Sequence, residues 1–283
     1  MKKKIVVFGS KGFIANSFKE SPLTEDEFKI IMLGKDKYNI LKKKNFKKIS
    51  TLLDKNTTVL FTSTIAPSKT FNDFVTNIQM ALNLKKIVNN KKVKNFIYIS
   101  SDAVYTDTKK KINENSKCLP GSLHGLMHLV REKIFTEIFG KTILILRPTL
   151  LFGSKDTHNG YGPNMFTRLA KKNKTIKLYG KGEERRDHLF IDDLIRIIFE
   201  AILKNKKGIF NISTGKVLSF FEIAKNIIKV TNSKSKIIFI KRNGPPHHLG
   251  LRQFDIKKIK KNFPKSKIKS ISSYLNEKFI ENY

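Results

Sequence analysis

Short apolar runs alternate, along the first half of the chain, with stretches whose apolar residues recur every three or four positions. The apolar runs predict β-strands near residues 4–8, 28–33, 57–62, 95–100 and 142–147. The helical spacing predicts helices near residues 12–19, 42–53, 71–90 and 122–139. Alternating strands and helices are typical of a parallel sheet with helices on both faces, so we predict an α/β fold with a doubly wound parallel (Rossmann) sheet.

The pattern changes after Pro148, where a loop rich in Gly, Asn and Pro leads into short elements. A helix near 192–204 and a strand near 208–212 should return to the sheet, and two basic helical stretches follow near the C-terminus. We therefore expect a sheet domain and a smaller C-terminal α+β lobe. The sheet domain comprises residues 1–152, completed by about 188–212, and the lobe comprises residues 153–187 and 213–283.

The composition is that of a folded protein, since 40% of its 283 residues are hydrophobic. No apolar run is long enough to cross a bilayer, and the N-terminal lysines lead directly into a strand without an apolar signal segment. We therefore expect a cytoplasmic protein with no membrane partner. The single cysteine, Cys118, excludes an intramolecular disulfide.

The formal net charge of +34 would by itself favour nucleic acid as a partner. The lysines, however, are spread over the whole length and accompany many Asn and Ile residues, a pattern typical of compositional bias rather than of one binding patch. We therefore expect no nucleic-acid partner. A diffuse positive field would still favour an anionic substrate.

A Gly-x-x-Gly-x-x-Ala turn joins the first predicted strand to the first predicted helix. Glycine allows a tight turn and a close approach of the backbone to a pyrophosphate, while the helix N-terminus offers free N–H groups. Ala15 permits close packing of helix on strand. The turn therefore predicts a dinucleotide site, in preference to an ordinary strand-to-helix connection. The residues expected to contact the cofactor here are Gly9, Ser10, Lys11, Gly12, Phe13 and Ile14.

The choice between nicotinamide cofactors is made at the adenosine ribose. An acidic residue after the second strand favours the free 2′-hydroxyl of NAD, whereas basic residues favour the 2′-phosphate of NADP. Lys35 takes the discriminating position here, and Lys11 can reach the same phosphate, although Asp36 could serve a free ribose. We predict NADP as the cofactor, with NAD as the alternative.

Several later segments resemble one protein family. Phe96–Tyr105 (FIYISSDAVY) resembles the strand that ends in a catalytic Ser or Thr in the extended short-chain dehydrogenase/reductases, which include nucleotide-sugar epimerases, dehydratases and 4-keto reductases. Leu146–Gly153 and Gly182–Asp193 resemble the Arg-Pro and Arg-Asp segments of that family. The resemblance covers nearly the whole chain. It implies a nucleotide-sugar substrate bound by the C-terminal lobe, a role in polysaccharide biosynthesis, and a homodimer formed through helices 71–90 and 122–139.

The resemblance also implies roles for single residues. Ser101 would hydrogen-bond the reacting oxygen, with Asp102 beside it, whereas Asn77 falls where the family has a helix asparagine or is a plain polar helix residue. One arginine would hold the substrate diphosphate, because a guanidinium fork matches phosphate oxygens. The residues implied to bind the substrate are Asn164, Arg186 and Arg252.

The sequence departs from the family at its central Tyr-x-x-x-Lys motif. In the aligned stretch, Pro120–Glu132, the two positions are His124 and His128. A histidine, with a pKa near 6.5, can exchange a proton at neutral pH without the lysine that a tyrosine, with a pKa near 10, requires. We predict His124 as the acid/base, with His128, one helical turn on, holding the nicotinamide ribose or relaying a proton. The implied catalytic set is Ser101, Asp102, His124 and His128.

Two other interpretations of the histidine pair remain open. A His-x-x-x-His pair on one helix face can bind zinc, but the general-base Glu of the zinc-protease motif is absent and no third ligand is evident, so we expect no metal. The pair could also mark a catalytically decayed protein that still binds a dinucleotide.

The leading reaction is the reduction of a keto-sugar nucleotide. Tyr38–Leu41 follows the second strand closely, as in the dTDP-4-dehydrorhamnose reductase branch, which implies reduction with external NADPH. Arg185–Asp193 is more similar to the epimerase and dehydratase branch, which implies a bound cofactor that is recycled. We predict an NAD(P)-dependent oxidoreductase that acts on a nucleotide-linked sugar, with epimerase or dehydratase activity as the alternative.

Overall fold

The computed structural model describes residues 2–24, 27–88, 92–156 and 158–275. The chain divides into two compact units. The sheet unit comprises residues 1–106, 114–148 and 195–211, and the second unit comprises residues 107–113, 149–194 and 212–283. From the sequence we expected residues 107–113, 149–152 and 188–194 with the sheet domain. They belong to the second unit because their backbones pair there, for example in the bridge between Ile112 and Phe254.

Six strands form the main sheet, in the order β10-β5-β4-β3-β1-β2. Strands β1 to β5 pair in parallel. Every residue of β3, β4 and β5 is buried, as expected of strands that are covered on both faces. The predicted doubly wound parallel sheet is confirmed. The strand bounds are β1 Lys3–Phe8, β2 Phe28–Leu33, β3 Thr57–Phe61, β4 Asn95–Ile99, β5 Ile143–Pro148 and β10 Gly208–Ile212.

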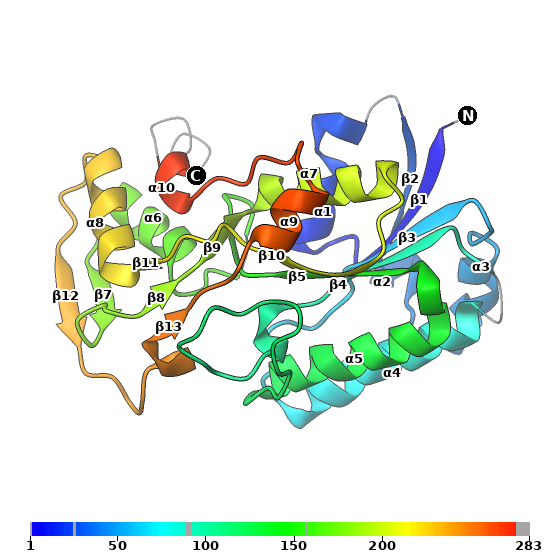
Figure 1. Cartoon of the computed structure of the whole chain (residues 1–283), viewed down its shortest axis with the longest axis horizontal. Helices are drawn as coiled ribbons and strands as arrows, with labels where there is room; N and C mark the ends of the chain where they lie inside the picture. The colour runs from blue at the N-terminus through cyan, green and yellow to red at the C-terminus, as the bar shows by residue number, and fades with distance from the viewer. Residues whose placement is uncertain (1, 25–26, 89–91, 157, 276–283) are drawn as a thin grey trace. The chain divides into compact units, whose positions relative to one another are not determined.

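Helices cover both faces of this sheet (Figure 1). On one face Phe18 of α1 stacks on Phe199 of α7, with ring centroids 4.5 Å apart. On the other face lie α4 and α5, where Phe139 stacks on Phe96 of β4 at 3.8 Å. The helix bounds are α1 Phe13–Lys19, α2 Lys35–Tyr38, α4 Phe71–Val88, α5 Leu123–Phe139 and α7 Ile191–Leu203, with 3-10 turns η1 Pro22–Thr24, η3 Asp102–Val104 and η4 Gly140–Thr142. Residues 89–90 of the helix predicted over 71–90 lie outside the described residues.

One predicted helix is shorter than expected. Residues 42–53 form the 3-10 turn η2 (Lys43–Asn45) followed by the short helix α3 (Phe46–Ser50). The side-chain amide of Asn45 donates to the carbonyl of Asn39 at 3.0 Å. Bonds of this kind between an asparagine and nearby backbone compete with a continuous helix.

The second unit is built from short strands and helices around its own core. β7 pairs in parallel with β12, β6 with β9, and β8 lies between β11 and β13. A capping box between Ser219 and Glu222 begins α8, and Pro163 occupies the first turn of α6, a helix that the loop-like composition did not predict. The bounds are β6 Leu150–Phe152, β7 Ile176–Tyr179, β8 Arg185–Arg186, β9 His188–Phe190, β11 Leu218–Ser219, β12 Ile237–Ile240, β13 Leu251–Arg252, α6 Pro163–Lys171, α8 Phe220–Val230, η5 His247–Gly250, α9 Lys257–Asn262 and α10 Ile271–Tyr274.

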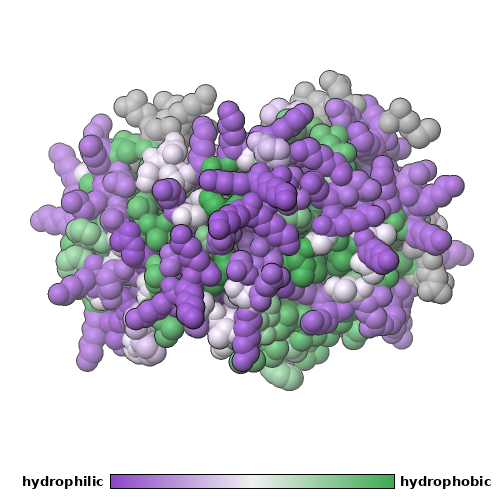
Figure 2. Space-filling view, viewed as in Figure 1, coloured by the Kyte–Doolittle hydropathy of each residue, from purple (hydrophilic) through white to green (hydrophobic). Residues whose placement is uncertain are grey.

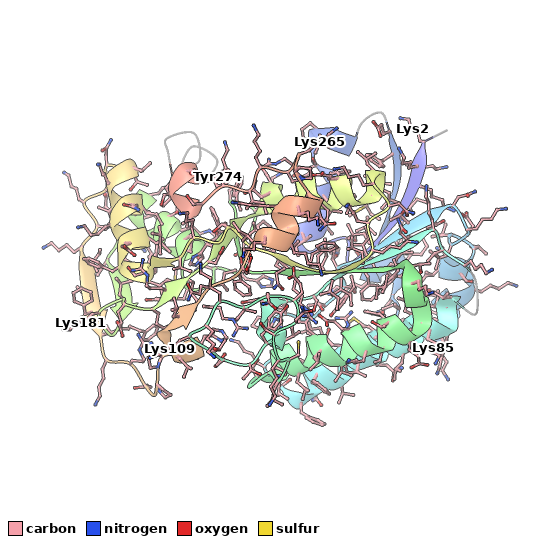
Figure 3. The ribbon with its side chains drawn as sticks, viewed as in Figure 1. Lys2, Lys85, Lys109, Lys181, Lys265 and Tyr274 are labelled. Atoms are coloured by element: carbon pink, nitrogen blue, oxygen red, sulfur yellow. The ribbon has the colours of Figure 1, made fainter. Side chains whose placement is uncertain are left out.

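Lysine and arginine residues occur in elements throughout the described part of the chain. On the face drawn in Figure 2, hydrophilic side chains are spread across many elements and are not gathered in a single band. Lys85 of α4, labelled in Figure 3, forms an ion pair with Glu137 of α5 at 2.6 Å and ties the two helices together. In the part of the chain that the structure describes, no helix is long and apolar enough to span a membrane.

Candidate active site

The turn after β1 has the geometry that a dinucleotide requires. Gly9 has a φ of +97°, and a Cβ there would lie 2.8 Å from Thr62 Oγ1 and 2.9 Å from the Ser63 nitrogen, so only glycine fits. The Gly12 nitrogen donates to the Gly9 carbonyl at 2.9 Å and closes the turn. Gly12 caps α1 without any side-chain hydrogen bond, so the amides of the first helical turn remain open to an anion. These residues fit the pyrophosphate of a nicotinamide dinucleotide.

Charged side chains gather at the adjoining end of β2. Lys11 Nζ lies 2.6 Å from Asp36 Oδ2. A Cβ on Gly34 would lie 2.3 Å from Ser10 Oγ, so this glycine lets the end of β2 pack against the phosphate turn and brings the two groups together. The hydrogen bond and charge of Lys11 lower the pKa of Asp36. The sequence left basic and acidic candidates for recognising the ribose, among them Lys11 and Asp36. In the structure these two side chains form an ion pair with each other.

The turn that follows β4 carries the first two predicted catalytic residues. Ser101 caps η3, its Oγ accepting from the Ala103 nitrogen at 3.1 Å. A Cβ on Gly125 of α5 would lie 2.1 Å from the Ala103 carbonyl oxygen. Glycine inside a helix costs about 1 kcal/mol relative to alanine, but here it allows the backbone of α5 to touch η3. This contact brings His124 to the turn that holds Ser101 and Asp102.

His124 lies half-buried at the start of α5. Its Nδ1 accepts a hydrogen bond from the backbone nitrogen of Ser68 at 3.3 Å, so the proton of the neutral ring is on Nε2. Burial lowers the pKa of His124 below its usual value, and the charge of Asp102 partly offsets that effect. At neutral pH the ring is therefore mostly uncharged and presents an N–H donor.

His128 lies one turn further along α5 and is buried. Its Nδ1 lies 2.7 Å from the hydroxyl of Tyr98 in β4. Burial lowers the pKa of His128 well below its usual value, with smaller contributions from His124 and Arg131. The two histidine rings meet edge to face, with centroids 4.7 Å apart. The predicted pair therefore forms one contiguous group within the sheet unit.

The loop after β3, residues 62–68, joins these parts. Asn77 of α4 is fully buried and clamps Ile65 with both ends of its amide, at 2.9 and 3.0 Å. Arg131 of α5 donates to the Ser63 carbonyl at 2.7 Å. The sequence did not single out Arg131 or Ser68. Arg131 lies three residues beyond His128 on the same helix face, and this spacing is the sequence feature from which its proximity to His128 could have been predicted.

A buried ion pair fixes α5 on the sheet. Arg147 of β5 donates to both carboxylate oxygens of Glu132, at 2.8 and 2.6 Å. Ser100 donates to the same carboxylate at 2.6 Å, and Arg147 also donates to the Tyr105 hydroxyl at 2.7 Å. Burial raises the pKa of Tyr105 to about 12, and its hydroxyl donates to Asn211 at 2.7 Å. Tyr105 is thus bound into a structural network and cannot take the place of the absent helix tyrosine.

The predicted substrate residues all belong to the second unit, where protein groups engage them. Arg186 donates to Glu184 at 2.6 Å, and Arg252 donates to Asp107 at 3.1 Å. The side-chain amide of Asn164 accepts from the Gly153 nitrogen at 3.0 Å. A phosphate that binds these arginines would therefore replace a carboxylate partner.

His188 of β9 belongs to the same unit and is 2% exposed. Both of its ring nitrogens lack a hydrogen-bond partner in the structure. Burial lowers its pKa to about 3, so the ring is uncharged at neutral pH. His188 lies in the segment Arg185–Asp193, which resembles the epimerase and dehydratase branch. No group of three metal-ligating side chains is present among the described residues.

Comparison with known proteins identifies relatives of the chain. Residues 5–213 match the NAD dependent epimerase/dehydratase family. Over 281 residues, the chain is 27% identical to a dTDP-D-glucose 4,6-dehydratase of Dictyostelium discoideum. That alignment covers 81% of this chain and 62% of the relative, so the chain spans less than two thirds of the relative's length.

Solved structures resemble the fold over almost the whole chain. A UDP-glucuronic acid 4-epimerase from Bacillus cereus, in complex with UDP-glucuronic acid and NAD, has a TM-score of 0.82 at 23% identity, covering 98% of this chain and 99% of that one. A dTDP-4-dehydrorhamnose reductase from Clostridium acetobutylicum has a TM-score of 0.82 at 16% identity, covering 98% of each chain. At these identities the likeness shows a shared fold.

Proposed function

The chain belongs to the NAD dependent epimerase/dehydratase family, and on this basis we propose that it is a nicotinamide-dependent oxidoreductase that reduces a keto-sugar nucleotide. The observation that carries the proposal is the loop 62–68. Ser63 in this loop packs against Gly9 of the phosphate turn, and Ser68 donates to His124. One short loop thus connects the cofactor turn to the residue proposed to exchange the proton.

A nicotinamide dinucleotide, when bound, exchanges hydride with a carbon atom of the substrate. Gly9, Gly12 and the open amides of α1 support binding of its pyrophosphate. Lys11, Lys35 and Asp36 would surround the adenosine ribose, and two lysines with one aspartate leave a net charge of +1. This charge supports NADP as the cofactor. NAD is the alternative, with the Asp36 carboxylate accepting from the free 2′-hydroxyl.

His124 is the proposed acid/base, and Nε2 is the atom that exchanges the proton. In the neutral ring, the Ser68 amide holds Nδ1 as an acceptor, and Nε2 offers an N–H that can hydrogen-bond the substrate oxygen. Transfer of that proton requires the imidazolium form, in which Nδ1 also carries a proton and no longer accepts from Ser68. An N–H donor suits a keto oxygen, which can only accept, better than a hydroxyl whose proton must be removed. This supports reduction over oxidation as the first step. Ser101 would hydrogen-bond the same oxygen, with Asp102 beside His124.

His128 is proposed to hold the nicotinamide ribose through Nε2, because its Nδ1 is engaged by Tyr98. In the second unit, Arg186 and Arg252 are proposed to bind the diphosphate of the sugar nucleotide, with Asn164 near the same ligand. Both arginines are buried and already paired with carboxylates. Substrate binding would therefore exchange a carboxylate for a phosphate at each guanidinium.

A second candidate function is an epimerase or dehydratase that keeps and recycles its cofactor. The names of the Dictyostelium and Bacillus cereus relatives favour it. A protein that binds the cofactor without turnover is the third possibility, because both residues of the central family motif are replaced.

The test is a cofactor balance during turnover. The purified protein is incubated with keto and hydroxy forms of UDP- and dTDP-linked sugars, and product and oxidised cofactor are quantified together. A reductase releases one oxidised cofactor per product from the keto form. Turnover with no net change in cofactor would establish the recycling reaction instead, and cofactor binding without any turnover would refute both enzymatic proposals.

A further inference from the structure

A cationic side chain lies in the core of the sheet unit, on the same helix as the two histidines. Arg131 of α5 is fully buried. Burial lowers the pKa of Arg131, and no carboxylate is among the groups that offset this effect. Among the described residues, no carboxylate lies within ion-pair distance of Arg131, and its Nε has no hydrogen-bond partner. Burying a charge without an opposite charge beside it is strongly unfavourable. We therefore expect other interactions of Arg131 to compensate for this cost.

Part of that compensation comes from the groups packed around the guanidinium. Arg131 donates to the Ser63 carbonyl and to the Thr64 hydroxyl. Its Cζ also lies over three aromatic rings, those of Phe61 at 5.0 Å, Tyr98 at 5.3 Å and Phe135 at 5.6 Å. Arginine binds aromatic faces well because the guanidinium is planar and weakly hydrated. The site is therefore built for a cation that stays charged.

These contacts connect Arg131 to both halves of the proposed site. Through Ser63 it supports the loop that packs against Gly9 of the phosphate turn. Through Tyr98 it supports the hydroxyl that binds Nδ1 of His128. Arg131 itself touches neither a cofactor nor a substrate, because it is fully buried.

We infer that Arg131 is a positioning residue that supplies the fixed positive charge of this site, in place of a cation at position 128. The inference rests on the proposed function in one respect, that a nicotinamide dinucleotide binds at this face of the unit. Positions 128 and 131 lie on the same face of α5. Two cations in one buried place would repel each other, so a neutral histidine at 128 and an arginine at 131 form a compatible pair.

The first test measures the protonation of His128 and does not depend on any activity. The six histidines are isotope-labelled and titrated by NMR in the full-length protein. The titratable or charged groups around His128 are His124, Tyr98, Arg131 and Glu132. Arg131→Met should raise the pKa of His128 toward its usual value, whereas Arg131→Lys should keep it low. Lys133→Met is the control, because it removes an exposed charge from the same helix.

An unchanged pKa of His128 in a folded Arg131→Met protein would overturn the inference. The second test covers the case in which that variant does not fold. Combining Arg131→Met with His128→Lys restores one cation to the site. If Arg131→Met alone is unfolded, we expect the double variant to regain a folded state, and a double variant that also fails to fold would overturn the inference. If Arg131→Met folds, the double variant should bind the dinucleotide at least about tenfold more tightly than the product of the two single losses predicts, a coupling that independent sites do not show.

The same measurements separate this inference from the proposed function. If the parent protein binds no dinucleotide, the proposed function fails, and the histidine titration with thermal unfolding of the double variant decides the inference alone. If the parent binds a dinucleotide but the two losses simply multiply, Arg131 is a structural residue and the inference is wrong.

Discussion

The Tyr98 hydroxyl lies 2.7 Å from Nδ1 of His128, between β4 and α5. Burial raises the pKa of Tyr98 and lowers that of His128 well below its usual value, so the hydroxyl donates and the ring nitrogen accepts. The proton of the neutral ring is therefore on Nε2. At the position where the related family has a lysine, His128 presents an uncharged Nε2–H group. The hydrogen bond from Tyr98 fixes the orientation of its ring.

Tyr98→Phe should destabilise the protein without disturbing the surface. The change leaves the buried Nδ1 of His128 without its donor, and an unsatisfied buried group costs about 1–3 kcal/mol in the free energy of unfolding. Urea denaturation measures the loss. Tyr38→Phe is the control, since the hydroxyl of Tyr38 has no hydrogen bond in the described part of the chain. Equal stability of the two variants would show that the Tyr98 bond contributes nothing.

His124→Ala should lower turnover about 100-fold or more, the scale of general acid/base removal, with little change in cofactor affinity. Burial lowers the pKa of His124, so in the reducing direction the rate should fall as pH rises through a midpoint below 6.5. Steady-state rates across pH measure both effects. His124→Gln separates two roles, because glutamine donates an N–H but does not titrate. Turnover near that of the parent in His124→Gln would assign hydrogen-bond donation instead of proton transfer.

Asp36→Asn should shift the cofactor preference toward NADPH. Asp36 holds Lys11 at 2.6 Å, and removing the carboxylate frees the ammonium group for a 2′-phosphate. Lys11→Ala should shift the preference in the opposite direction. Calorimetric titration of both variants with NADPH and NADH measures the ratio of affinities. If neither variant changes that ratio, the adenosine ribose does not bind beside this ion pair.

The helices α4 and α5 should pair two copies of the chain into a homodimer. Phe71, Val75 and Leu82 of α4 and Leu126 of α5 are exposed, with Phe71 at 69%. Exposed apolar side chains on two neighbouring helices are compatible with a surface that is covered in an assembly. Light scattering should give twice the chain mass for the parent and one chain mass for Leu126→Glu. Leu203→Glu, which changes an exposed leucine on α7, should leave the dimer intact.

His188 should make the protein sensitive to acid. Its pKa is about 3 in the folded state and about 6.5 in the unfolded state, so the unfolded chain binds the extra proton as pH falls. Its contribution to stability is present above about pH 6.5 and is lost as pH decreases toward 3, with a slope of up to about 1.4 kcal/mol per pH unit. His188→Leu should flatten this slope in urea titrations, whereas the exposed His158→Leu should not.

The sheet could be predicted from the sequence because its strands coincide with short apolar runs. The apolar runs at 28–33 and 208–212 correspond to the observed bounds of β2 and β10. Helix α6 was not predicted, since it begins at Pro163 within a stretch whose Gly and Asn content is typical of a loop. Proline at the first helical turn is compatible with a helix, but composition alone does not distinguish the two uses.

The chemistry of the site was only partly predictable, because much of it depends on contacts between distant residues. His124 and His128 follow from a local alignment. The backbone amide that fixes the His124 tautomer belongs to Ser68, and the carbonyl that Arg131 binds belongs to Ser63, which lies in the same loop. No periodic pattern relates these positions along the chain. The pairing of Arg252 with Asp107 spans an even longer stretch of sequence.

The contact between Gly125 and the Ala103 carbonyl has a consequence for how such a site can evolve. It fixes the start of α5 through backbone atoms, and the Glu132–Arg147 pair fixes the helix further along. Neither contact uses the side chains at 124 and 128. The side chains at these two positions can therefore be exchanged while the backbone of α5 keeps its place, and the cost is confined to their own hydrogen bonds with Ser68 and Tyr98.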